Sequence, residues 1–259
     1  MRDLLRHSLA MLRDFRLVGL HLILNAALLV SASFWLLIPE EHVWQLIFAA
    51  LSAVLIIVVF LWLHSATLVY GANPIRSEFR GAFALRLARM FWLLIGCIAL
   101  FWCMRVVDGW MDHRWQIAGY LYSKAPSSLR PIGGENGYVN LVEYAFSILL
   151  WYVLPLALLP IVAARVVGAR VRDGLRALSH WRYWVAMAIT SAVGVWLTSL
   201  ILEWIPGKTL RQQTTSLVLR LAVVYALATA AWLVTAGLLG YFVARGGDSS
   251  ADVAGKAAA

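Results

Sequence analysis

Long runs of apolar residues, separated by short polar segments, dominate the pattern of this chain. A helix needs about 20 mostly apolar residues to cross a hydrocarbon core of about 30 Å. Five runs that meet this length contain no Asp, Glu, Lys or Arg: 17–38, 43–75, 144–164, 183–202 and 221–244. A sixth uncharged run, 90–104, is shorter. It becomes long enough to cross the membrane only if it begins at Leu87 and if the side chain of Arg105 extends its charge to the interface.

This pattern predicts an all-α, polytopic membrane protein with six transmembrane helices in a single domain, residues 1–245. The small, polar segment 246–259 is expected to be a disordered cytoplasmic tail. The expected spans are about 17–38, 43–70, 87–108, 141–164, 183–204 and 217–243.

A basic, amphipathic segment precedes the first, third and fifth spans. In the third copy, apolar residues recur at near-helical spacing, while Arg172 and Arg176 lie on another face. The apolar positions of that copy are Val171, Leu175, Leu178 and Trp181. In the second copy, Phe79, Phe83 and Leu87 lie opposite Arg80 and Arg86. These segments favour three hairpins, each preceded by a cytoplasmic surface helix, as an internal repeat. The alternative is that any protein with basic cytoplasmic loops has this pattern.

The distribution of charge orients the spans. Hydrophobic residues make up 62% of the chain and charged residues only 14%, yet the net charge is +9. Arginine and lysine gather before spans one, three and five and after span six, which predicts that both ends lie in the cytoplasm. We expect anionic lipid headgroups, and not nucleic acid, as the partner of this charge. The arginines expected to face lipid are Arg76, Arg80, Arg86, Arg89, Arg170, Arg172 and Arg176.

Two stretches that enter predicted hairpins, FRGAFALRLARMFWLL and GLRALSHWRYWVAM, carry a resemblance to a known group. The chain resembles bacterial six-helix inner-membrane proteins of unknown function, including those similar to the membrane domain of some glycerophosphoryl diester phosphodiesterases. The resemblance implies this fold and a multi-pass location in the bacterial cytoplasmic (inner) membrane. It carries no catalytic motif, because the phosphodiesterase chemistry belongs to a separate soluble domain.

Polar residues inside the spans are candidate functional positions, since ionisable groups are costly in a membrane. His64 and Asn25 form a candidate intramembrane polar site. Pro155 and Pro160 predict a kink in the fourth span, because proline removes a backbone donor and clashes with the preceding turn. A cluster of ion pairs is expected at the outer ends of spans three to six, from Arg105, Asp108, Glu143, Glu203 and Arg220. Each feature is also compatible with helix packing alone.

The motifs of known catalytic sites are missing from the sequence, so we expect a protein that is not an enzyme and has no catalytic residues, cofactor or metal site. Asp108, Asp112 and His113 are interpreted as a solvated loop between spans three and four, a segment too short to form a core of its own. The expected function is that of a scaffold or accessory subunit in contact with anionic lipid, with protein partners or as a homo-oligomer. The alternative is a small transporter or lipid-handling permease with a site near the outer charge cluster and the kinked fourth helix.

Overall fold

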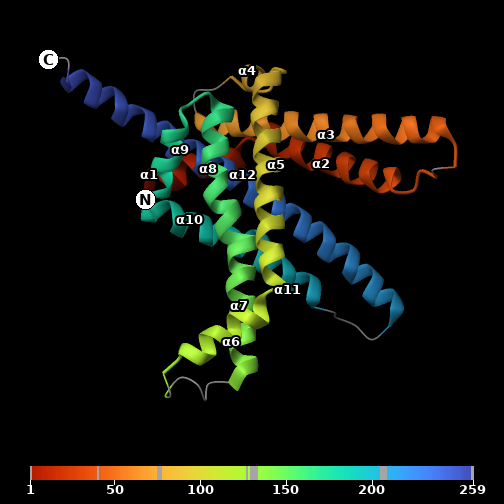
Figure 1. The fold of residues 1–259 in the computed structure, drawn as a ribbon. Coiled ribbons are helices and arrows are strands. Elements are labelled where there is room, and N and C mark those ends of the chain that lie inside the picture. The colour runs from red at the N-terminus through yellow and green to blue at the C-terminus, as the bar shows by residue number, and fades with distance from the viewer. Residues whose placement is uncertain are drawn as a thin grey trace. The chain divides into compact units, whose positions relative to one another are not determined.

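The structure is a computed structural model that describes residues 2–39, 41–74, 78–126, 128, 134–204 and 209–257. The chain divides into two compact units, each described separately below. Unit 1 comprises Met1–Leu93 and Pro160–Ala259, and unit 2 comprises Leu94–Leu159. The ribbon in Figure 1 gives the path of the chain through both.

The described residues form helices and their connections, with no strand among them. In order, the helices are α1 (Arg2–Arg13), α2 (Phe15–Trp35), α3 (Val43–Ala72), α4 (Phe79–Ala82), α5 (Leu87–Met111), α6 (Arg114–Lys124), α7 (Gly134–Ile148), η1 (Leu149–Val153), α8 (Leu154–Val167), α9 (Val171–Leu178), α10 (Trp181–Ser191), η2 (Ala192–Leu197), α11 (Thr198–Glu203) and α12 (Leu210–Ala257).

Six helices are long and apolar enough to cross a membrane, as the sequence predicts. Three are the continuous helices α2, α3 and α5. Two are composite, because α7, η1 and α8 run together over Asn136–Val167, and α10, η2 and α11 over Trp181–Glu203. The sixth is the Leu210–Ala244 part of α12. The protein is therefore a multi-pass membrane protein.

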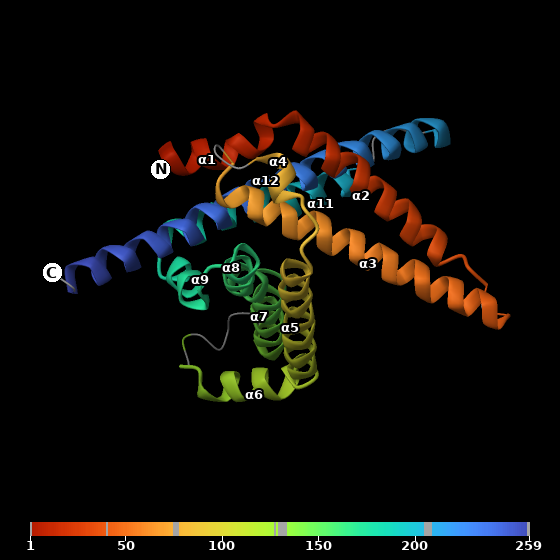
Figure 2. The same cartoon turned by 90° about the horizontal axis from the view of Figure 1, so that it is seen from above.

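Close packing of α3 against α12 builds the centre of unit 1, and Figure 2 shows the two helices crossing. Glycine makes the approach possible. A Cβ atom on Gly71 would lie 2.6 Å from the carbonyl oxygen of Ala236, and one on Gly240 would overlap the carbonyl of Gly71. Small residues at a crossing allow two backbones to come this close, and the resulting van der Waals contact stabilises helix pairs in a membrane.

Two of the three predicted surface helices pack onto this crossing. Helix α1 buries Leu4, Ser8 and Met11 and contacts α12, where a Cβ on Gly237 would lie 3.0 Å from Met11. Helix α9 buries Gly174 and Ala177 and also contacts α12. We call this region the packed ends: residues 15–21 of α2, 61–71 of α3 and 233–243 of α12, with α1 and α9.

The remaining lengths of the same helices have almost no core. We call them the free halves: residues 26–35 of α2, 43–59 of α3 and 210–224 of α12. Of these residues, only Gln45 and Arg220 are buried. Along α2 and α3 the free halves border a groove of about 610 Å³, and the indole of Trp35 donates a 2.8 Å hydrogen bond to the carbonyl of Ala49.

The second of the three predicted surface helices is much shorter than expected. Helix α4 covers only Phe79–Ala82, and its aromatic residues contact α3. The Phe79 and Tyr70 rings lie 6.0 Å apart, and Trp62 donates a hydrogen bond to the carbonyl of Phe83. These rings therefore pack on protein, whereas the sequence places them on a lipid-facing helix. Because the three lead-in helices differ in length, the internal repeat stays a prediction.

Unit 2 has a small core of its own, where the sequence predicts a solvated loop without one. Helix α6 packs against α7 and buries Ala118 between Val139 and Val142. Much of the connection is thus helical: α5 continues to Met111, and α6 begins at Arg114. Asp108, Asp112 and His113 are exposed, as expected, but α6 packs on the start of the fourth span and forms a core together with it.

Both composite spans change their hydrogen-bond pattern along their length. In the fourth span the π-helical turn η1 ends directly before Leu154, next to Pro155, whose ring cannot fit a regular preceding turn. Pro160 lies inside the regular helix α8. The second π-helical segment, η2, contains no proline, so the sequence gives no signal for it.

Helix α12 also continues through Ala257, so the backbone is helical where the sequence predicts a disordered tail.

Candidate functional site: a polar cluster at the packed ends

The most extensive polar contacts within the spans of unit 1 centre on His21. This side chain is fully buried in α2, and its Nε2 lies 2.7 Å from the hydroxyl of Thr67 on α3, which is also fully buried. Thr67 donates its single proton to the carbonyl of Leu63, at 2.7 Å. Its oxygen must therefore accept a proton from His21, which assigns the hydrogen of the neutral imidazole to Nε2.

Asn25 forms a hydrogen bond with the other ring nitrogen of His21. Its side-chain nitrogen lies one turn further along α2 and 3.3 Å from His21 Nδ1. Because Nδ1 carries no proton in this tautomer, Asn25 is the donor. Both nitrogens of His21 are thus satisfied, so this residue ties α2 to α3 and has no nitrogen left for a further ligand.

His64 lies beside His21 but keeps one nitrogen open. The two rings have centroids 5.8 Å apart and nearly perpendicular planes. His64 Nδ1 donates to the carbonyl of Phe60 at 2.9 Å, and the Phe60 ring lies 4.1 Å away over the imidazole. These two contacts hold the ring in place. Nε2 then retains its lone pair, and no hydrogen bond to Nε2 forms within the described residues.

Helix α12 completes the cluster with an indole. The ring of Trp232 lies 5.2 Å from that of His64, and its Nε1 donor is buried without a hydrogen-bond partner in the described part of the chain. Nearby, Tyr225 of α12 donates a 2.5 Å hydrogen bond to the carbonyl of Leu22. The cluster therefore joins α2, α3 and α12, with one acceptor and one donor unused.

Sequence analysis identified His64 and Asn25, and the structure brings both of them to His21. It missed His21, since that residue lies only five positions after Arg16, close to the expected membrane boundary. The spacing of His21 and Asn25 by four residues, which places them on one face of a helix, is the signal that could have found it.

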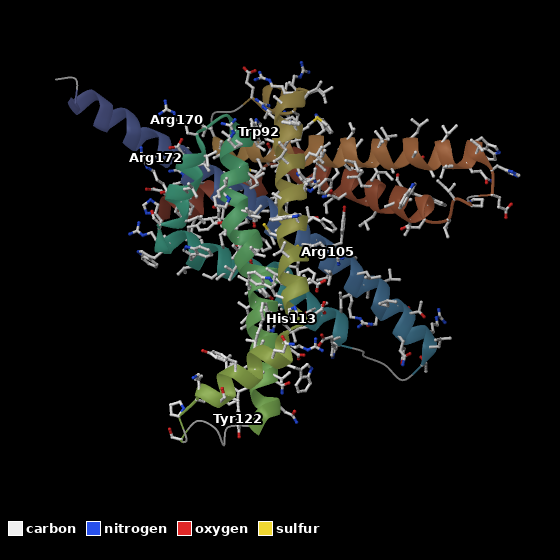
Figure 3. The ribbon with its side chains drawn as sticks, viewed as in Figure 1. Trp92, Arg105, His113, Tyr122, Arg170 and Arg172 are labelled. Carbon is white, nitrogen blue, oxygen red and sulfur yellow. The ribbon has the colours of Figure 1, made fainter. Side chains whose placement is uncertain are left out.

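The predicted outer charge cluster is distributed over both units. In unit 2, Arg105 and Asp108 form the expected pair within α5 at 3.5 Å, with both side chains exposed. Figure 3 shows Arg105 on this helix. Glu143 pairs instead with Arg114, at 2.8 Å, a residue that was not part of the predicted cluster. The expected ion pair of Glu143 thus forms, but with a cation from the connection between the spans.

In unit 1, Arg220 is buried, and it bonds backbone carbonyls instead of a carboxylate. Its guanidinium donates to the carbonyls of Leu202 and Trp204, at the end of α11, and to that of Ser216. A cation at a helix C-terminus satisfies carbonyls that have no partner within the helix. Glu203 is exposed. Arg220 therefore attaches α12 to α11.

The basic residues expected to face lipid divide into exposed and packed ones. Arg80, Arg86, Arg170 and Arg172 are exposed, and the last two extend from the start of α9 in Figure 3. Arg89 is half-buried and donates to the carbonyl of Ala82, and Arg176 lies 4.0 Å from Asp173. Arg76 lies outside the described residues.

Helix α9 combines a packed face with an exposed apolar one. A Cβ on Gly174 would lie 2.5 Å from the carbonyl oxygen of Pro160, so this face fits tightly against α8. On the other side, Val171 and Leu175 are about half exposed, and Trp181 is 65% exposed just beyond the helix. This arrangement is typical of a helix that lies at a membrane surface.

No group of three or more metal-binding side chains occurs within the described ranges. No protein-family model, curated protein or solved structure matches the chain.

Proposed function

We propose that this multi-pass membrane protein is a non-enzymatic scaffold or accessory subunit of a membrane assembly in contact with anionic lipid. The observation that carries the proposal is the groove between the free halves of α2 and α3. Small residues on both helices border it, namely Ala27, Ser31 and Ser52, among larger apolar side chains. Small residues and serine hydroxyls let another transmembrane helix approach closely, so the groove fits a partner helix.

The arginines at the packed ends support contact with anionic lipid. Arg170 and Arg172 are exposed next to the apolar edge of α9, so the helix can place its apolar side chains below lipid headgroups while its cations meet phosphate. In this proposal the packed ends face the cytoplasm, the six spans form three hairpins, and the membrane is the bacterial inner membrane. The proposed orientation rests on the excess of basic residues in the segments assigned to the cytoplasm.

Native mass spectrometry of the gently extracted protein tests this function. If the protein is a subunit, it retains a protein partner or a second copy at fixed stoichiometry. The variants Ser31→Phe and Ser52→Phe place a large side chain in the groove and should lose that partner. The matched control is Ser33→Phe, an exposed serine of the same helix that does not border the groove. A chain that remains alone in every gentle extraction would contradict the proposal.

A second candidate function is that of a small transporter or lipid-handling permease. The cluster of His21, Asn25 and His64 favours it, because polar groups inside spans often mark substrate pathways. The sequence alternative placed the site near the outer charges, but Arg220 is engaged with backbone carbonyls. Flux in reconstituted vesicles that requires no partner and is lost in His64→Phe would favour the permease.

A further inference from the structure

We infer that His64 and Trp232 form a binding site for the free hydroxyl of a neutral, diacylglycerol-like lipid. The site goes beyond the proposed scaffold function and does not depend on it. It follows from three features of the pair: its unused hydrogen-bonding groups, its depth along α3, and its opening toward the membrane.

The hydrogen-bonding groups of the pair are complementary to an alcohol. His64 presents an acceptor at Nε2, and Trp232 presents a buried donor at Nε1. A hydroxyl is both donor and acceptor, so one group can satisfy both residues. The two rings lie with centroids 5.2 Å apart, so a single small group can contact both residues. A ketone, an ester or an ether would satisfy only the tryptophan.

The depth of His64 matches that of a lipid glycerol group. Helix α3 has 30 residues, which is about 45 Å, and the hydrocarbon core is about 30 Å thick. When the helix is centred in the core, His64 lies about 5 Å inside the boundary nearest to Ala72. Ester and alcohol groups of a lipid lie near this boundary, and its acyl chains extend toward the middle of the core.

The pair is partly exposed to lipid, although Trp232 Nε1 itself is buried and reached only past the surrounding rings. His64 and Trp232 are only half-buried, and the Phe60 ring that stacks on His64 is 41% exposed. His21, the polar group next to them, is already satisfied by Thr67 and Asn25. Unpaired polar groups are costly in hydrocarbon, where water is scarce. A lipid alcohol that arrives from the membrane removes this cost.

The test uses the full chain in phosphatidylcholine nanodiscs and two probes, 1,2-dioctanoylglycerol and the same molecule with its hydroxyl acetylated. We expect the alcohol to bind about three- to tenfold more tightly than the acetate, the range for the one hydrogen bond to His64 that only the alcohol can donate. Only the alcohol should shift the imidazole Nε2 signal of His64 in protein labelled with 15N-histidine.

Two variants examine each half of the site. Trp232→Phe removes the donor but keeps an aromatic ring, and His64→Phe removes the acceptor. His64→Phe should abolish the preference for the alcohol, because both probes can then only accept from Trp232. Trp232→Phe should weaken the binding of both probes and keep the preference, while Trp102→Phe, at an exposed tryptophan of α5, should change neither. Equal binding of the two probes would overturn the inference. So would a His64 Nε2 signal that shows a hydrogen bond to water and does not shift when the alcohol is added. The comparison of probes in the unmodified chain remains decisive if a variant fails to fold.

Discussion

The two ends of the same three helices in unit 1 differ in how they are held. At the packed ends, Leu63 of α3 is completely buried, and glycines bring α3 within backbone contact of α12. In the free halves, Leu55 of the same helix is 64% exposed and borders a groove. The free segment of α3 is the more apolar of the two, so apolar character alone does not determine burial. Small residues and polar contacts determine which segment packs within the chain and which is left for lipid or a partner.

Gly240 gives the largest expected effect. In Gly240→Leu the side chain would overlap the backbone of Gly71, and neither helix can yield without separating. We expect loss of the folded, monodisperse protein in size-exclusion chromatography after detergent extraction. Gly19→Leu on α2 is the control, because a Cβ there meets nothing within 4 Å. Normal folding of Gly240→Leu would show that the packed ends do not depend on this crossing.

Leucine truncation measures the same contrast directly. Leu63→Ala removes a fully buried side chain and should lower the free energy of unfolding by about 2 to 5 kcal/mol. Leu55→Ala should change it by less than about 1 kcal/mol, since that side chain faces lipid or the groove. Unfolding by a denaturing detergent, followed by circular dichroism, gives both values. Equal losses would remove the distinction between the two segments of α3.

A threonine pair tests the polar contribution to the packed ends. Thr67→Val keeps the shape of the side chain but leaves the Nε2 hydrogen of His21 without its acceptor, and should cost about 1 to 2 kcal/mol. Thr214→Val in the free half of α12 removes only a bond to the carbonyl of Leu210, from an exposed position. Its effect on the same unfolding curve should be near zero. The prediction fails if the two variants unfold alike.

The smallest effect is expected from the exposed ion pair of unit 2. Arg105→Gln breaks a 3.5 Å pair whose side chains are 68% and 59% exposed, and such pairs contribute about 0 to 1 kcal/mol. Thermal unfolding should therefore be almost unchanged. A large loss of stability would mean that Arg105 supports the fold through contacts other than Asp108.

The sequence was sufficient for the six spans, because a membrane requires long apolar helices and little else resembles them. It identified His64 and Asn25 but not their connection through His21, since contacts between helices depend on rotation and tilt, which hydropathy does not encode. The same limit explains Arg114, whose partner Glu143 lies on another helix. The orientation and the lipid contacts of the arginines stay predictions.

Site-specific photo-crosslinking in the native membrane tests most directly whether the free halves serve partners. A photoreactive amino acid at Leu55 of the groove should give one defined protein adduct, with the same partner or second copy captured from Leu28 on α2. The same amino acid at an exposed position outside the groove, Leu51, should give mainly lipid adducts. Only lipid adducts at all three positions would contradict the assignment of the groove to a partner helix.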